Sequence, residues 1–131
     1  MKEKQLARLS RRERQIMDVV FARGPASAAE ILEALDEPPS YSTVRTQLRV
    51  LEEKGFLRHR EQGPRYIYYP TIAPSRARVS ALRHVVRTFF NSSTDDVVAT
   101  LMDISGSEMT DEDYRRLSAI IERSRKEGKA Q

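Results

Sequence analysis

The fold is decided by one stretch, Ser40–Gly55, which reads SYSTVRTQLRVLEEKG. Within it, Val44, Leu48 and Leu51 recur at the i, i+4, i+7 spacing that is typical of a buried helical stripe. A second set, spaced at i, i+3, i+4 and i+7, has no apolar member and consists of Ser42, Arg45, Thr46 and Arg49. The pattern predicts a helix that buries one face and presents hydroxyl and guanidinium groups on another.

Both ends of this helix have residues that suit helix termini. Ser40 and Ser42 are both candidates for the N-cap, because a hydroxyl there accepts a hydrogen bond from a free N–H of the first turn. Gly55 suits the left-handed conformation that ends a helix, and Lys54 suits the negative end of its dipole. Arginine can bind guanine bidentately and a threonine methyl can pack on a thymine methyl. A polar helix face is more often only solvated, so the flanking sequence has to decide between solvation and DNA binding.

The sequence before this stretch predicts two further helices. Ser10 and Glu13 form one capping box, and the helix that follows ends at Gly24-Pro25. Ser27 and Glu30 form a second capping box, and the prolines at 38 and 39 end that short helix. Two helices, a tight turn and a third helix with a polar face are typical of a helix-turn-helix.

The sequence after this stretch predicts a β-hairpin over residues 56–70. Aromatic and β-branched residues flank the turn signal Gly63-Pro64, as in the wing of a winged helix-turn-helix. Arg60 and Arg65 flank its tip, and we favour contact with a phosphate backbone or a minor groove over simple solvation. The tyrosines at 66, 68 and 69 are expected to pack on the core and neighbouring helices rather than to stack on single-stranded bases.

Residues 75–122 predict three amphipathic helices, the first capped by Ser75, with a loop at residues 105–107. The polar tail 123–131 is expected to be disordered at its end. Such a small bundle cannot bury its apolar stripes alone, so we expect it to form a homodimer. The predicted dimerisation residues are Val79, Leu82, Val86, Phe89, Phe90, Val97, Val98, Leu101, Leu117 and Ile121. The predicted domains are therefore 1–72, which binds DNA, and 73–131, which dimerises.

Composition agrees with a DNA-binding N-terminal part. The net charge of +4 is uneven, because residues 1–80 have 15 Lys/Arg against 10 Asp/Glu and residues 81–131 have 8 against 9. No cysteine is present, which excludes disulfides and thiolate metal sites. His59 and His84 have no second ligand at metal-site spacing, and the acidic clusters at 95–96 and 111–113 suit helix starts. We expect a cytoplasmic protein with no enzymatic activity, cofactor, metal or membrane insertion.

The chain resembles the penicillinase-repressor (BlaI/MecI/CopY) family of bacterial transcription factors over about residues 6–122. The resemblance rests on four segments, which are residues 9–17 (LSRRERQIM), 41–46 (YSTVRT), 48–55 (LRVLEEKG) and 66–70 (YIYYP). It implies a homodimeric repressor that binds a dyad operator through its winged helix. It also implies base contacts from Ser42, Thr43, Arg45, Thr46 and Arg49. Implied phosphate contacts come from Ser10, Arg11, Arg60 and Arg65.

Two departures from the family concern how the repressor is released. Copper-responsive members use cysteine metal sites, which this chain lacks. Other members are cut by a membrane sensor peptidase, commonly at an Asn-Phe bond, and the matching bond here is Thr100–Leu101. The preferred residue pair is absent, so the inducing signal stays open.

The sequence thus predicts a mainly α fold with a small β-hairpin, a winged helix-turn-helix followed by a three-helix dimerisation region. The predicted function is that of a homodimeric repressor of a palindromic operator. The alternative is a winged-helix adaptor that binds proteins and not DNA. The arginines on the third helix disfavour this alternative, since a protein-binding face is expected to show aromatic anchors.

Overall fold

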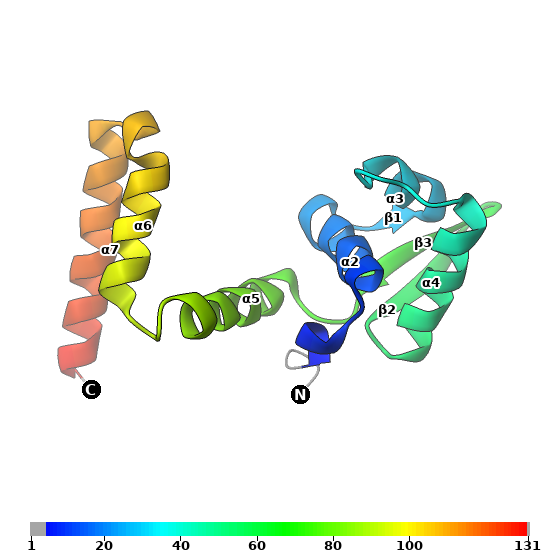
Figure 1. Ribbon diagram of the computed structural model, residues 1–131, viewed down its shortest axis with the longest axis horizontal. Helices are drawn as coiled ribbons and strands as arrows, with labels where there is room; N and C mark the ends of the chain where they lie inside the picture. Colours follow the sequence, from blue (N-terminus) through cyan, green and yellow to red (C-terminus); the bar gives the residue numbers. More distant parts are fainter. Residues whose placement is uncertain (1–4, 131) are drawn as a thin grey trace. The chain divides into compact units, whose positions relative to one another are not determined.

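The computed structural model describes residues 5–130, with side chains through residue 128. The chain forms two compact units, Met1–His84 and Val85–Gln131. The first contains η1 (Leu6–Arg8), α2 (Arg11–Arg23), β1 (Ala26–Ser27), α3 (Ala28–Ala34), α4 (Tyr41–Glu53), β2 (Leu57–Gln62) and β3 (Arg65–Pro70) (Figure 1). The helix α5 (Pro74–Phe89) begins in the first unit and ends in the second, which also contains α6 (Thr94–Ser105), η2 (Gly106–Glu108) and α7 (Asp111–Ala130). The predicted boundary at 72/73 lies just before α5 and stays a prediction.

The helices of the N-terminal unit begin where side chains satisfy their first N–H groups. The predicted capping boxes are confirmed, because Ser10 with Glu13 and Ser27 with Glu30 each make both reciprocal hydrogen bonds. At the start of α4, Ser40 is the cap, and its Oγ accepts a hydrogen bond from the Thr43 N–H at 3.2 Å. The choice between Ser40 and Ser42 is therefore settled for Ser40.

The core of this unit lies between the three helices and the sheet. Val44, Leu48 and Leu51 are fully buried, which confirms the apolar stripe predicted for α4. They join the equally buried Ile16 and Ile31 from α2 and α3. Burying each such side chain contributes roughly 1.5–3 kcal/mol to folding. The buried stripe fixes the rotation of α4 about its axis and so turns its polar face outward.

The sheet has three antiparallel strands in the order β1-β3-β2, one more than the predicted hairpin. In the hairpin, Gln62 pairs with Arg65 across a turn in which Gly63 has a φ of 62°. The unpredicted strand β1 pairs Ala26 with Tyr68 and joins the other edge of β3. A strand of two residues is too short to show alternating hydrophobicity, so the sequence pattern gave no sign of it.

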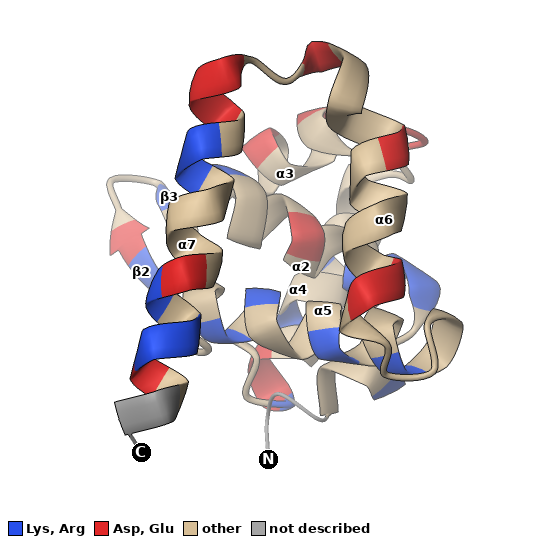
Figure 2. Cartoon of the chain, turned by 90° about the vertical axis from the view of Figure 1, so that its left-hand side faces the viewer, with Lys and Arg blue, Asp and Glu red and all other residues tan. Residues whose placement is uncertain are grey.

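The C-terminal unit is built differently, since none of the described side chains of residues 85–128 is buried. The helices α6 and α7 run antiparallel and are connected through η2 (Figures 1 and 2). No helix within residues 5–130 is long and apolar enough to cross a membrane.

Three local predictions for the C-terminal region were wrong. The helix α5 begins at Pro74, a residue preformed for the first helical position, so Ser75 lies inside the helix instead of capping it. Residues 106–108 form the 3-10 helix η2 rather than an open loop. The polar tail is helical as far as Ala130, because it is rich in good helix formers and contains a Glu122–Arg125 ion pair of 2.7 Å. Residue 131 lies outside the described part of the chain.

Candidate nucleic-acid interface

The outward face of α4 contains all the residues that the sequence predicts to contact bases. Exposed side chains on this face are Ser42, Thr43, Arg45, Thr46 and Arg49. The Arg49 side chain is 72% exposed, and its Nε lies 3.9 Å from a carboxylate oxygen of Glu53. An ion pair this long and this exposed holds the guanidinium only weakly. Arg49 is therefore free to reach a base edge.

The first turn of α4 presents a small cluster of hydroxyl groups. The Oγ of Ser40 lies 3.1 Å from that of Ser42 and 2.8 Å from the Oγ1 of Thr43. Each hydroxyl both donates and accepts, so the cluster can offer donors to DNA without losing the N-cap.

The wing supplies two exposed arginines at the end of the sheet that lies farthest from α5. The Arg60 guanidinium lies over the Tyr69 ring at 5.3 Å, a cation–π contact that orients it. Arg65 is exposed at the first position of β3. Arg65 adjoins the turn at the tip of the hairpin, whereas Arg60 pairs with Ile67, two residues farther from the turn.

A cavity of about 380 Å³ lies between α4, the β1–α3 junction and the wing. The residues that line it include Tyr41, Arg45, Arg65, Tyr66 and Tyr68. Arg45 lies over the Tyr41 ring at 5.9 Å, and its pKa is raised, first of all by a hydrogen bond with the Tyr41 phenol. Burial raises the pKa of Tyr68, so this phenol stays protonated at neutral pH. Sequence reasoning missed the cavity, although the i, i+4 spacing of Tyr41 and Arg45 was a local sign of their contact.

The wing is tied to α4 through His59. Its Nδ1 lies 2.7 Å from a carboxylate oxygen of Glu52, and its ring stacks on Tyr66 at a centroid distance of 4.1 Å. Tyr68 packs in the core as expected, whereas Tyr66 is 40% exposed, so the expectation that all three wing tyrosines are core residues was wrong. The two side chains share one face of β3, but Tyr66 lies near the turn, whereas Tyr68 lies farther along the strand where β1 pairs with it through Ala26.

A second tie joins the end of α4 to the start of α2. The Lys54 Nζ donates to a carboxylate oxygen of Glu13 at 2.7 Å, and the other Glu13 oxygen accepts from the Ser10 N–H at 2.8 Å. The hydrogen bond from Lys54 is the main cause that lowers the pKa of Glu13, ahead of the opposing effect of burial. The exposed residues Ser10 and Arg11, both predicted to contact phosphates, are thereby held next to the end of α4.

The residues predicted to dimerise fall into two groups by exposure. Exposed members are Val79, Leu82, Phe89, Val98, Leu101 and Ile121, and half-buried members are Val86, Phe90, Val97 and Leu117. Ile104 and Ile120, which the prediction omitted, are 72% and 55% exposed. They belong to the same pattern of unburied apolar residues on α6 and α7.

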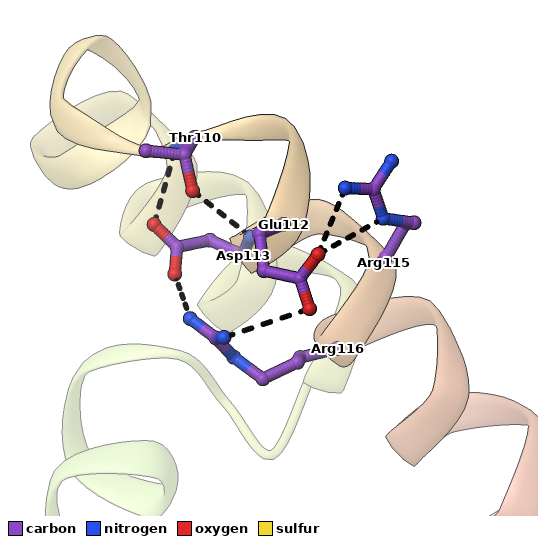
Figure 3. Close-up of polar contacts among 5 residues, drawn as sticks. All are labelled: Thr110, Glu112, Asp113, Arg115 and Arg116. Carbon is purple, nitrogen blue, oxygen red and sulfur yellow. Dashed lines mark hydrogen bonds and ion pairs between the residues drawn. The ribbon is translucent and has the colours of Figure 1, made fainter.

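The charged cluster at the start of α7 is satisfied within itself. Thr110 and Asp113 exchange hydrogen bonds as a capping box, Arg115 binds Glu112 at 2.8 Å, and Arg116 binds Asp113 (Figure 3). Figure 2 shows this turn in red, with basic residues farther along the helix. Acidic groups at a helix start and basic groups after it suit the helix dipole, so the cluster serves the helix itself.

Three helices, a three-stranded sheet with a wing, and an exposed arginine-bearing face on the third helix of the unit define a winged helix-turn-helix transcription regulator. Residues 9–123 match the family described as penicillinase repressor, and the chain therefore belongs to this family. The fold class predicted from the sequence is confirmed.

Individual proteins agree with this assignment. The penicillinase repressor of Bacillus licheniformis is 23% identical over 121 residues, which are 91% of this chain and 93% of that protein. Among solved structures, the complex structure of hsRosR-S4 superposes with a TM-score of 0.60 at 17% identity, covering 82% of this chain and 98% of that one. The transcriptional regulator Tm0710 from Thermotoga maritima superposes with a TM-score of 0.50 at 14% identity, covering 93% and 78%.

Proposed function

We propose that the chain is a homodimeric repressor that occupies a palindromic operator and excludes RNA polymerase by steric overlap. The observation that supports it best is the division of α4 into a fully buried apolar stripe and an exposed face of hydroxyls and arginines. An α-helix fits the major groove, where each base pair shows a distinct pattern of donors and acceptors. The α4 face enters this groove, while Ser10, Arg11, Arg60 and Arg65 contact the flanking backbone.

The homodimer is supported by the exposed apolar side chains of the C-terminal helices. Phe89 is 74% exposed and Ile104 is 72% exposed, in a unit that has no buried side chain among residues 85–128. Contiguous exposed apolar surface marks an interaction site, and a second copy of the same chain covers it with a self-complementary patch. Two α4 helices spaced by one turn of DNA then read the two halves of a palindrome.

Release of the operator follows from weakening of the dimer, because one protomer keeps only half of the DNA contacts. In this proposal the repressor works in the cytoplasm, and a membrane sensor peptidase is a candidate partner. The candidate bond is Thr100–Leu101, which lies within α6, and the side chain of Leu101 is exposed. A peptidase needs an extended substrate, so cleavage there requires local unfolding of α6.

The proposal is tested by offering the purified full-length protein a pool of random-sequence DNA duplexes. We expect enrichment of an inverted repeat and binding that weakens steeply with salt, because neutralised phosphates release counterions. Arg49→Ala, with an unchanged thermal unfolding curve, is expected to lower operator affinity by about 1–3 kcal/mol. A wild-type protein that enriches no sequence would overturn the proposal and favour a protein-binding winged helix.

A further inference from the structure

We infer that the cavity between α4 and the wing is a phosphodiester site, in which Arg45 and Arg65 hold one backbone phosphate of the DNA with help from tyrosine hydroxyls. Arg45 then positions the protein on the duplex and does not read a base, unlike its neighbour Arg49. This inference rests on the proposed DNA-binding function and divides the polar face of α4 into two roles.

The first step of the argument is the direction in which Arg45 is held. Side chains of a helix lean toward its N-terminus, so Arg45 reaches back over Tyr41, one turn earlier. The 5.9 Å cation–π contact keeps the guanidinium there. Arg49 is paired in the opposite direction, with Glu53, and it does not line the cavity. Two arginines spaced by one turn thus face different surroundings.

The second step is what converges on the cavity. Arginines from α4 and from the wing line it, together with Tyr41, Tyr66 and Tyr68. The volume of about 380 Å³ lies near the lower end for small-ligand sites, enough for a phosphate and the sugar atoms beside it. Several hydrogen-bond donors beside the small residues Ala28 and Ala29 suit an anion with many acceptor oxygens.

The third step is the charge balance at the rim of the cavity. Glu30 is one of the nearby carboxylates, with Glu52 beside Tyr68 and Glu61 paired across the hairpin with Tyr66. The pKa of Glu30 is lowered first by the hydrogen bond from the Ser27 N–H and further by the charges of Arg23 and Arg65. Its carboxylate is already engaged by Arg23 at 2.7 Å and by Ser27 at 2.9 Å. Glu30 therefore offsets Arg65 only in part, and Glu52 is itself engaged by His59 at 2.7 Å.

The fourth step is where the cavity lies. It sits between the helix proposed to enter the major groove and the hairpin proposed to reach the backbone or minor groove. The strand of DNA that separates two grooves is the sugar–phosphate backbone. A planar guanidinium binds phosphate oxygens bidentately, and a phenol O–H can donate to a third oxygen. Contacts of this kind fix register and orientation and are the same for every sequence.

The test compares Arg45→Ala with Arg49→Ala as a matched control on the same face of α4. Wild type and both variants select from the same pool of random-sequence duplexes. We expect Arg45→Ala to enrich the wild-type motif unchanged, with roughly tenfold weaker binding to any duplex and a salt slope smaller by about one. Arg49→Ala is expected to lose the preference at one base pair of each half-site. Thermal unfolding of both variants checks that the fold is intact.

A second arm places a neutral methylphosphonate at single positions of the selected duplex. We expect one position in each half-site where this change weakens the wild type about tenfold and leaves Arg45→Ala unaffected, because the contact is already gone. Tyr41→Phe keeps the ring and should weaken binding less than Arg45→Ala at the same position. A lost base preference in Arg45→Ala, or no position coupled to it, would overturn the inference. Failure of the wild type to select any motif contradicts the proposed function itself, before the variants are compared.

Discussion

The helices of the N-terminal and C-terminal units have similar amphipathic patterns, but their apolar side chains are buried in the first unit and exposed in the second. In the N-terminal unit the apolar stripe of α4 is fully buried against α2 and α3, and Leu48 has no exposed surface. In the C-terminal unit the apolar residues of α6 and α7 stay open, and Ile121 is 61% exposed. The comparison teaches that apolar periodicity predicts a helix that needs a partner surface, and that the partner can lie within the chain or outside it.

The largest expected effect comes from opening the closed core. Leu48→Ala removes a fully buried side chain on the inner face of α4 and should lower the free energy of unfolding by about 2–5 kcal/mol. Urea denaturation followed by circular dichroism measures this change. The control is Thr46→Ala, an exposed position on the same helix, which should change stability by no more than about 0.5 kcal/mol. Equal effects at both positions would contradict the closed core.

The next largest effect, on dimerisation, is expected from placing a charge on the exposed apolar surface of the C-terminal helices. Phe89→Glu places a carboxylate on the most exposed apolar side chain of α5 and should convert the dimer to monomer, because an interface buries charge at high cost. Sedimentation equilibrium should show at least a roughly hundredfold weaker dimer, about 2.7 kcal/mol. The control, Thr88→Glu, adds the same charge at the neighbouring exposed polar position. A wild-type chain that is already monomeric at high concentration would remove the basis of this prediction.

A smaller effect on the free energy of unfolding is expected at the Glu13–Lys54 ion pair of the N-terminal unit. Glu13→Gln should lower stability by about 1–3 kcal/mol, because Lys54 loses its ionic partner while the shape is kept. The folded-state pKa of Glu13 is depressed below the ordinary value of 4.5, so the contribution is complete above 4.5 and is lost as pH falls through the folded pKa. Unfolding free energies measured from about pH 6 to about pH 3 should therefore converge for wild type and variant. Parallel curves down to the lowest pH would argue against this assignment.

The smallest effect is expected at the exposed ion pairs of α7. Arg115→Ala removes a contact of 2.8 Å between side chains that are 71% and 59% exposed (Figure 3). Exposed pairs of this kind contribute about 0.2–1 kcal/mol at most, and the effect should fall further in high salt. Thermal unfolding at low and high salt provides the measurement. A loss of unfolding free energy as large as that of Glu13→Gln would mean that Arg115 makes a further contact besides this ion pair.

The elements that the sequence predicted well are those whose signals are local. Capping boxes at Ser10 and Ser27 involve residues three apart, and the α4 stripe repeats within one helix, so neither needs knowledge of the rest of the chain. The strand β1 and the Glu13–Lys54 ion pair join distant segments and left no local pattern. The polar tail was misjudged because its composition suits both a solvated helix and a disordered end.

By itself, the sequence determined the winged-helix class, the two-faced third helix and the position of the arginines along it, because helical and strand periodicities are properties of short segments. Only the tertiary structure decided that Arg45 and Arg65 share a cavity while Arg49 lies outside it, and that the N-terminal core closes while the C-terminal helices stay open. The physical reason is that a cavity or a buried surface depends on which segments meet in space, and a periodic pattern specifies a face without naming what covers it.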